Sequence, residues 1–173
     1  MDIGVRMIDL ALWTSGNFDV ASVSATAYSK FGSRGLGEGS WGASTPEGIP
    51  FDVEDSASAF LRMRNGASVQ IEVSWVVRQK EDDAHGVEIF GTEAGASLPP
   101  VEIYRLDKDV ADPVNCARIG LPLSYPHCNR FVNFGRALQG IEQPCVTMDQ
   151  ALSVQQVIDV TFQSVAWGRE VLL

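Results

Sequence analysis

The sequence predicts an α+β fold in which helices pack on one face of an open-faced, mainly antiparallel β-sheet. Three observations lead to this prediction: an apolar helical segment opens the chain, alternating segments joined by an Asn-Gly turn fill its middle, and two helical patterns close it. Helices at both ends of a run of antiparallel strands make an α+β sandwich. The 173 residues are expected to form one domain, 1–173, which is large enough to bury its own core.

The first helix is expected over Met1–Trp13 (MDIGVRMIDLALW). Its apolar residues leave almost no polar stripe, so we expect a helix that is buried on most sides. Asp2 and Arg6 lie four residues apart, which places them on one helix face with the acid N-terminal to the base, the favourable order for an ion pair. Gly16 is typical of the position just after the last helical turn.

Alternating apolar and polar residues predict the strands that follow. Asp19–Lys30 carries small residues on both faces, and residues 55–64 lead into Asn65-Gly66, the strongest short hairpin signal. The partner strand over residues 69–77 has one apolar face and one polar, weakly charged face, which is either a subunit interface or a solvated surface. Two further strands are expected at Val87–Phe90 and Val101–Leu106, on either side of a turn at Thr92–Pro100. The total is then about five or six strands.

Two helices are expected at the C-terminal end of the chain. The first covers His127–Gln139 after Pro126 and ends at Gly140. The second begins at the capping box Thr147–Gln150 and runs to about Trp167. Its inward stripe is expected to contain Ala151, Val154, Ile158, Phe162 and Val165.

Two motifs suggest ligand sites, but their context argues against both. Gly37-x-Gly39-x-x-Gly42 matches the dinucleotide fingerprint, yet prolines follow where the fingerprint requires a helix. The acidic run of residues 81–83 with His85 could be drawn as a metal site, but contiguous acids in a turn are usually solvated. We therefore expect that this chain alone binds neither a dinucleotide nor a metal.

The overall charge and the cysteine content restrict the class of protein. A formal net charge of -9 argues against nucleic acid or an anionic membrane surface as a partner. No apolar run approaches the roughly 18 residues of a membrane span, and no basic-then-apolar signal segment opens the chain, so we expect a cytoplasmic protein. Cys116, Cys128 and Cys145 are odd in number and lack Cys-x-x-Cys spacing, which favours reduced, mostly buried thiols.

Four segments carry a resemblance to a known family. They are an opening Asp-x-Gly-x-x-x-x-Asp pattern followed by Leu-Ala-Leu-Trp, the strand pair FDVEDSASAFLRMRN and GASVQIEVSW, the strand and turn VEIFGTEAGASL, and a closing helical region that ends in Gly-Arg-Glu-Val. In this order they resemble the C-terminal domain of the Gfo/Idh/MocA oxidoreductases, the relatives of glucose-fructose oxidoreductase and inositol dehydrogenase. The resemblance spans nearly the whole chain.

The resemblance implies an NAD(P)-dependent oxidoreductase that acts on a sugar, polyol or similar hydroxyl substrate. In such relatives the dinucleotide sits on an N-terminal Rossmann domain, which also supplies a lysine in a Glu-Lys-Pro motif. This sequence has neither feature, and its only lysines are Lys30, Lys80 and Lys108. We therefore expect the substrate-binding and oligomerisation half of such an enzyme, which cannot transfer hydride unless a Rossmann domain is supplied in cis or in trans.

The resemblance also nominates site residues. It places Asp2 and a histidine of the first helix in the catalytic set, but Arg6 stands in place of that histidine. Arginine keeps its charge and offers only donors, so Arg6 can bind an anion but cannot act as a general base. Asp9 and His127 are candidate substrate-binding residues. The structural alternatives are a helix cap for Asp2 and a capping or solvent-exposed role for His127.

A second hypothesis belongs to a different class of protein. The chain is then a free-standing, non-catalytic binding or assembly module derived from such an enzyme, with Met1 as the start of a shortened frame. Under both hypotheses we expect a homo-oligomer that associates through the open face of the sheet.

Overall fold

The computed structural model forms two compact units, Met1–Lys80 with Val146–Leu173 and Glu81–Cys145. The residues it describes are 2–34, 50–80, 84–106, 113–115 and 129–173. The glycine motif at residues 37–42, the acidic run at residues 81–83, Cys116 and the segment 126–128 lie outside them. Among the described residues, none of the helices combines the length and the apolar character needed to cross a bilayer.

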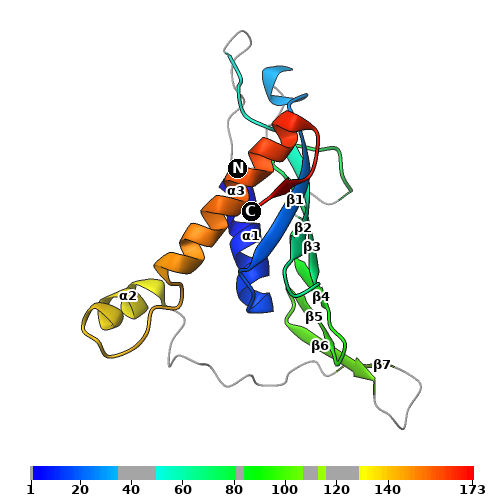
Figure 1. Cartoon of the computed structure of the whole chain (residues 1–173). Helices are drawn as coiled ribbons and strands as arrows, with labels where there is room; N and C mark the ends of the chain where they lie inside the picture. Colours follow the sequence, from blue (N-terminus) through cyan, green and yellow to red (C-terminus); the bar gives the residue numbers. More distant parts are fainter. Residues whose placement is uncertain (1, 35–49, 81–83, 107–112, 116–128) are drawn as a thin grey trace. The chain divides into compact units, whose positions relative to one another are not determined.

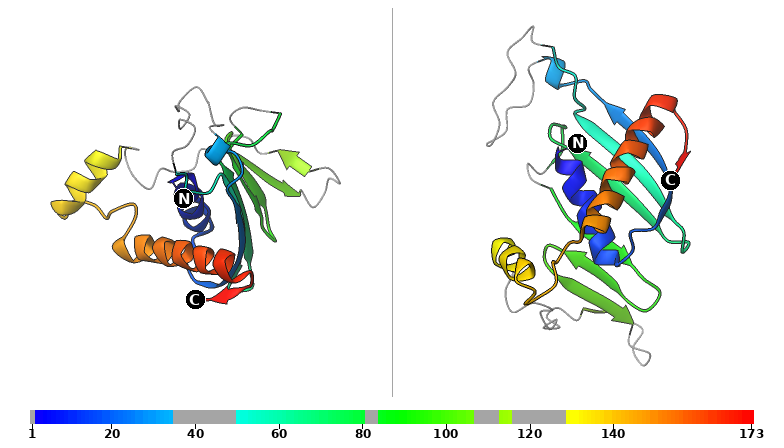
Figure 2. Two further views of the ribbon diagram at one scale, coloured as in Figure 1. Left: turned by 90° about the horizontal axis from the view of Figure 1, so that it is seen from above. Right: turned by 60° about the vertical axis from the view of Figure 1, so that its left-hand side comes forward.

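The first unit is a four-stranded antiparallel sheet with two helices on one of its faces (Figures 1 and 2). The strands lie in the order β3-β2-β1-β8, so the short C-terminal strand pairs with β1. The elements of this unit are α1 (Asp2–Ser15), β1 (Val20–Tyr28), the 3-10 helix η1 (Gly32–Arg34), β2 (Ser56–Met63), β3 (Ser68–Ser74), α3 (Met148–Trp167) and β8 (Val171–Leu172).

The second unit contains another four-stranded antiparallel sheet, in the order β4-β5-β6-β7, and one helix. The expected α+β class with mainly antiparallel strands is confirmed, but the described residues alone form eight strands in two sheets, against the five or six predicted. Strand β5 accounts for part of the difference. A turn was predicted at its position, because its small residues show no apolar alternation. The elements are β4 (Val87–Phe90), β5 (Gly95–Leu98), β6 (Glu102–Leu106), β7 (Pro113–Asn115) and α2 (Arg130–Leu138).

The core of the first unit lies between its sheet and the helices α1 and α3. Alternate residues of β2 are buried, as the sequence pattern predicted, and the positions between them are partly or fully exposed. The Asn65-Gly66 turn joins β2 to β3, and Gly66 adopts a φ of 89°, which a glycine accepts without strain. The central side chains of this core are Leu12, Val23, Leu61, Ile71 and Val157.

Helix α1 is less buried than the sequence suggested. Only one stripe, Gly4, Ile8 and Leu12, is buried, whereas the Trp13 side chain is 48% exposed. The helix lies on one face of the sheet beside α3, so only one side of it contacts apolar surface. The prediction of a helix buried on most sides was therefore wrong for the described part of the chain.

Helix α3 begins and ends where the sequence predicted, at the Thr147 cap and at Gly168, whose φ is 63°. Its buried face is different from the predicted stripe, because Ala151 and Phe162 are exposed whereas Thr161 and Ser164 are buried. Hydrogen bonds explain this difference. The Ser164 hydroxyl accepts from the backbone N–H of Ala25 at 2.9 Å and donates to the Arg169 carbonyl at 2.6 Å, so it satisfies polar groups inside the core.

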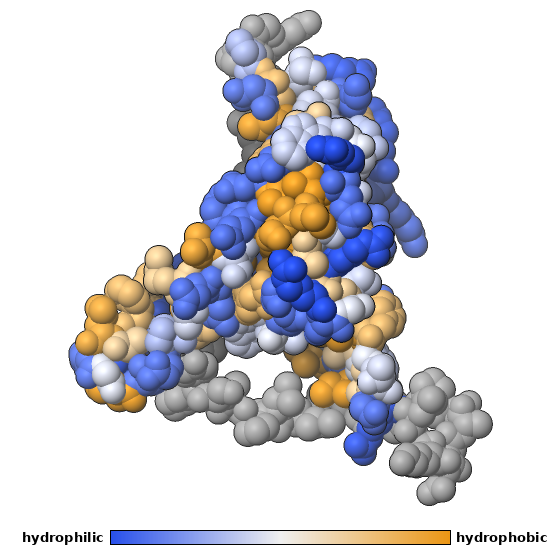
Figure 3. Space-filling view, in the orientation of Figure 1, coloured by the Kyte–Doolittle hydropathy of each residue, from blue (hydrophilic) through white to orange (hydrophobic). Residues whose placement is uncertain are grey.

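Helix α2 begins at Arg130, after Asn129 as its N-cap. Its apolar side chains are largely exposed, with Phe131 at 73% and Phe134 at 64%, and Figure 3 shows apolar surface over this helix. The polar side of α2 is the buried one. Asn133, only 5% exposed, binds the connection that leads from α2 to α3.

Candidate functional site

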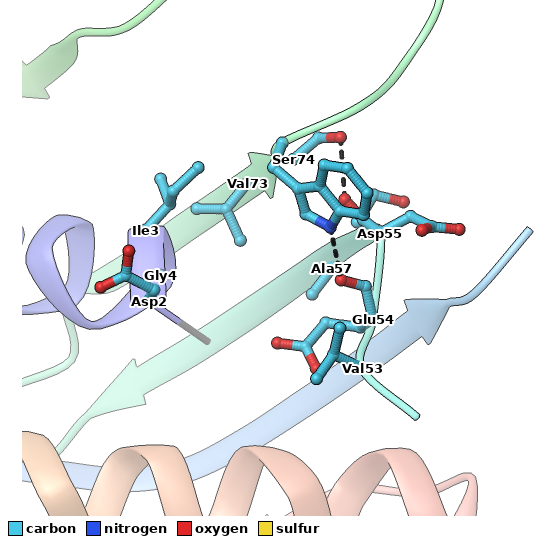
Figure 4. Close-up of a pocket in the computed structure, with 11 residues that line it drawn as sticks. Asp2, Ile3, Gly4, Val53, Glu54, Asp55, Ala57, Val73 and Ser74 are labelled. Carbon is cyan, nitrogen blue, oxygen red and sulfur yellow. Dashed lines mark hydrogen bonds between the residues drawn. The ribbon is translucent and has the colours of Figure 1, made fainter. Parts of the chain in front are cut away.

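A cavity of about 280 Å³ opens in the first unit, where the first turn of α1 meets β2 and β3 (Figure 4). Strand β2 begins and β3 ends at this edge of the sheet, so the segments next to them complete the wall. Apolar side chains of Ile3, Val53 and Val73 form much of the lining. The acidic residues in the lining are Asp2, Glu54 and Asp55.

Asp2 is the predicted site residue that the structure places at the cavity. It lies in the first turn of α1, where the helix dipole favours a negative charge. Its carboxylate accepts from the Arg6 guanidinium at 3.4 Å, and the two side chains are 85% and 76% exposed. An exposed pair at this spacing contributes about 0.3–0.5 kcal/mol. The interaction therefore orients Asp2 weakly and leaves its carboxylate accessible to a ligand.

The other predicted site residues lie away from the cavity lining or outside the described residues. Arg6 does not line the cavity, but it forms an ion pair with Asp2, which does. Asp9 lies further along α1, is half-buried and does not line the cavity. His127 lies outside the described residues. The roles of Asp2, Arg6, Asp9 and His127 stay predictions.

Asp55 is part of the cavity lining and was not a predicted site residue. It is 1% exposed, and its carboxylate accepts hydrogen bonds from three consecutive backbone amides. Phe31 N–H donates to Oδ2 at 2.6 Å, Gly32 N–H donates to Oδ1 at 2.9 Å, and Lys30 N–H also donates to Oδ2. Such a nest of amides compensates the buried negative charge.

Trp75 supplies an aromatic wall and was also missed as a site residue. Its indole N–H donates to the Glu54 carbonyl at 2.9 Å, and its ring lies 5.7 Å from the ring of Phe51 between centroids. The alternating pattern predicted Trp75 on the apolar face of a strand over residues 69–77, whereas β3 ends at Ser74 and Trp75 directly follows it at the cavity. The cavity itself could not be read from that pattern, because residues far apart in the sequence form it.

The lining combines exposed acceptor oxygen with apolar and aromatic surface. A carboxylate accepts hydrogen bonds from hydroxyl groups, and an indole ring packs against C–H bonds, so a polyhydroxylated ring or chain suits both surfaces. Among the described lining residues there is no histidine, lysine, cysteine or tyrosine. The described wall can therefore bind and orient a ligand, but it offers only carboxylates for proton transfer.

The described residues do not fit a dinucleotide. A Rossmann-type site needs a parallel βαβ unit with a glycine-rich turn, whereas the neighbouring strands described here pair antiparallel. No reaction step through a nicotinamide can be assigned to them.

Comparisons with known proteins agree with this architecture. Residues 1–97 match the profile of the GFO/IDH/MocA C-terminal domain. D-glucoside 3-dehydrogenase of Escherichia coli (strain K12) is 27% identical over 184 residues, an alignment that covers 100% of this chain and 48% of that enzyme. The chain thus spans about half the length of the curated relative it matches.

Solved structures show the same fold. Aldose-aldose oxidoreductase from Caulobacter crescentus, complexed with glycerol, has a TM-score of 0.68 at 18% identity, over 98% of this chain and 46% of that one. The WlbA dehydrogenase from Bordetella pertussis, in complex with NADH and UDP-GlcNAcA, has a TM-score of 0.64 at 18% identity, over 98% of this chain and 43% of that one. The profile match over residues 1–97 identifies this fold as a GFO/IDH/MocA C-terminal domain. The chain belongs to the GFO/IDH/MocA family.

Proposed function

We propose that this chain is the substrate-binding part of an NAD(P)-dependent oxidoreductase that acts on a hydroxyl group of a sugar, polyol or similar molecule. The observation that carries the proposal is the cavity in which accessible Asp2 lies opposite an aromatic and apolar wall. The names of two similar proteins, a D-glucoside 3-dehydrogenase and an aldose-aldose oxidoreductase, support the same substrate class.

In this proposal Asp2 accepts a hydrogen bond from a substrate hydroxyl, and Trp75 packs against the C–H face of the substrate ring. Arg6 forms an ion pair with Asp2, but it does not take up a proton. The nicotinamide cofactor is held by a Rossmann domain, in cis or in trans. The 173-residue chain alone therefore does not transfer hydride.

Calorimetric titration with methyl β-D-glucoside and with myo-inositol tests the binding role. We expect one of these probes to bind the purified chain, and we expect Asp2→Asn to weaken its binding about tenfold through loss of a charge-assisted hydrogen bond. Asp149→Asn is the matched control, because Asp149 is the acid in the first turn of α3. Binding that is equally strong in Asp2→Asn would contradict the assignment of this residue.

The expected lack of independent catalysis has its own measurement. The purified chain is incubated with NAD⁺ or NADP⁺ and each probe, and formation of reduced cofactor is followed by absorbance. We expect no turnover. Measurable reduction would show that the chain is active by itself and would remove that part of the proposal.

A second role, self-association through the outer face of the first sheet, has separate support. In the described part of the unit α1 and α3 pack on the opposite face. The outer face carries small polar side chains such as Ser24, Thr26 and Ser58, together with the partly exposed rings of Tyr28 and Phe60. A weakly charged, helix-free sheet face of this kind suits a second copy of the chain.

Sedimentation velocity across a range of protein concentrations tests this role. We expect an oligomer, and we expect Ser58→Arg, in the middle of the outer face, to shift it towards monomer. Gln155→Arg, on the exposed side of α3, is the matched control. A strictly monomeric parent chain would exclude self-association. Self-association without binding of either probe would favour the non-catalytic assembly module.

A further inference from the structure

Asp55 is the charged side chain that is fully buried among the described residues, and the proposed function gives it no contact with substrate. A buried carboxylate is costly unless every oxygen is satisfied. Here its oxygens accept from the consecutive amides of Lys30, Phe31 and Gly32. The three amides come before residues 35–49 in the sequence, and Asp55 comes after residues 35–49. The carboxylate therefore ties together the two sides of that connection.

The side chain of Asp55 reaches Trp75 through packed neighbours. Gly32, which donates to Oδ1, lies directly against the ring of Phe51, and a Cβ atom at this glycine would overlap that ring. The Phe51 ring in turn packs against Trp75, with centroids 5.7 Å apart. The Phe51 ring thus lies in contact with both Gly32 and the Trp75 ring.

The main chain of Asp55 reaches the same tryptophan directly. Its carbonyl oxygen accepts from the Trp75 backbone N–H at 3.2 Å and from the Ser74 hydroxyl at 3.0 Å. The preceding residue, Glu54, accepts the Trp75 indole N–H through its own carbonyl. Figure 4 shows the bonds of the Ser74 hydroxyl and of the indole N–H beside the cavity. The carbonyl groups of residues 54 and 55 therefore bind both the backbone and the ring of Trp75.

We propose that Asp55 is a positioning residue of the cavity, whose carboxylate holds the support behind Trp75 and thereby fixes the aromatic wall that a ligand contacts. The consequence for ligand binding rests on the proposed function. The consequence for Trp75 does not, because the chain of contacts from the carboxylate to the indole ring exists without a ligand.

Fluorescence quenching of Trp75 tests the proposal. The chain has four tryptophans, so Trp13, Trp41 and Trp167 are first replaced by phenylalanine. In this background Asp55→Asn keeps the side-chain shape but removes the charge and one acceptor oxygen. We expect the acrylamide quenching constant of Trp75 to rise about twofold, because local loosening exposes the ring. Asp52→Asn makes the same chemical change at an exposed position and is expected to leave quenching unchanged.

Binding of methyl β-D-glucoside is the second readout. We expect its dissociation constant to rise about fivefold in Asp55→Asn with an unchanged far-ultraviolet spectrum. Unaltered Trp75 quenching in a folded Asp55→Asn variant would overturn the proposal. If the parent chain binds no probe, the proposed function fails, whereas the quenching result still decides the positioning role.

A milder variant covers the case in which Asp55→Asn does not fold. Phe51→Leu removes the ring through which Gly32 and the Asp55 carboxylate support Trp75, and it leaves the carboxylate intact. We expect a smaller rise in Trp75 quenching, about 1.5-fold. Quenching identical to that of the parent would then overturn the proposal.

Discussion

Glu170 lies beside the C-terminal strand and interacts with two residues of the first sheet. The buried Ser22 hydroxyl donates to its carboxylate, and Arg62 Nε donates to the same oxygen at 3.1 Å. The Ser22 hydrogen bond lowers the pKa of Glu170; partial desolvation opposes this effect and the positive charge of Arg62 adds to it. A side chain from the loop before β8 thus ties the C-terminus to β1 and β2.

The lowered pKa of Glu170 predicts a pH-dependent contribution to stability. A carboxyl whose folded pKa lies below its unfolded value of about 4.3 stabilises the fold above that value, and the contribution is lost as pH falls through the folded pKa. We therefore expect Glu170→Gln to lower the melting temperature at pH 7 and to have a smaller effect at pH 3. Thermal unfolding at both pH values is the measurement, with the exposed Glu93→Gln as control. A difference of equal size at both pH values would contradict the assignment.

The family resemblance nominated Asp2, which lines the cavity, whereas nothing in the sequence pointed to Asp55. Asp2 belongs to a pattern within one helix, where spacing of residues predicts proximity. Asp55 interacts with backbone amides that are 23 to 25 residues away in sequence. Backbone amides carry no residue signature, so the partners of Asp55 became visible only with the fold. Trp75 was predicted as an apolar strand residue, whereas it directly follows the end of β3, and its cavity depends on the same long-range contacts.

At the scale of single elements, the N-terminus of α3 has a complete capping box. The Thr147 hydroxyl accepts from the Gln150 N–H at 3.3 Å, and the Gln150 side chain accepts from the Thr147 N–H at 2.9 Å. We expect Thr147→Ala to reduce the free energy of unfolding by about 1 kcal/mol. Urea unfolding measures the change, and Thr92→Ala at an exposed turn position is the control. Equal stability of Thr147→Ala and the parent would show that water replaces the cap.

Helix α2 holds the connection to α3 through one buried amide. Asn133 Nδ2 donates to Glu142 Oε1 and to the Gln143 carbonyl, both at 3.0 Å. Its Oδ1 accepts from the Cys145 N–H at 2.9 Å and from the Cys145 thiol at 3.1 Å. No sequence pattern indicated this role, since asparagine is more common at turns and caps than inside helices.

Replacement of Asn133 is expected to loosen this connection locally. Asn133→Ala leaves the Cys145 N–H and the Gln143 carbonyl without their partner, at a cost of about 1–3 kcal/mol. We expect faster reaction of the Cys145 thiol with a thiol reagent, because the connection opens more often. Mass spectrometry of the labelled peptide measures the rate at Cys145 alone, and Gln139→Ala at the exposed end of α2 is the control. An unchanged labelling rate would mean that other contacts hold the connection.

Elements were predictable where local chemistry determines them. The capping box, the Asn-Gly turn and the glycine after α1 are short signals, and the structure places helix ends and the β2–β3 hairpin at them. The buried face of α3 was not predictable in this way. Its polar members Thr161 and Ser164 are buried because their hydroxyls bind backbone groups, a compensation that a hydrophobic pattern does not register.

At the scale of the whole molecule, the class of the fold followed from the order of helical and alternating segments. The grouping of strands did not, because register and sheet membership depend on contacts between distant segments. The first unit combines the N-terminal segment with the last residues of the chain, and β8 pairs with β1 across 148 to 150 positions of sequence. Such pairing of the two ends has no local signal.

The central claim is that the cavity beside Asp2 binds a polyhydroxylated substrate against Trp75. Its most direct test is a titration of the ¹⁵N-labelled chain with methyl β-D-glucoside up to about 100 mM, a range that reveals millimolar binding. The indole signals are followed and assigned by single tryptophan replacements. We predict that the Trp75 signal shifts, that Trp13 and Trp167 stay unchanged, and that Asp2→Asn needs about tenfold more glucoside for the same shift. A stationary Trp75 signal, or an identical titration curve in Asp2→Asn, would contradict the claim.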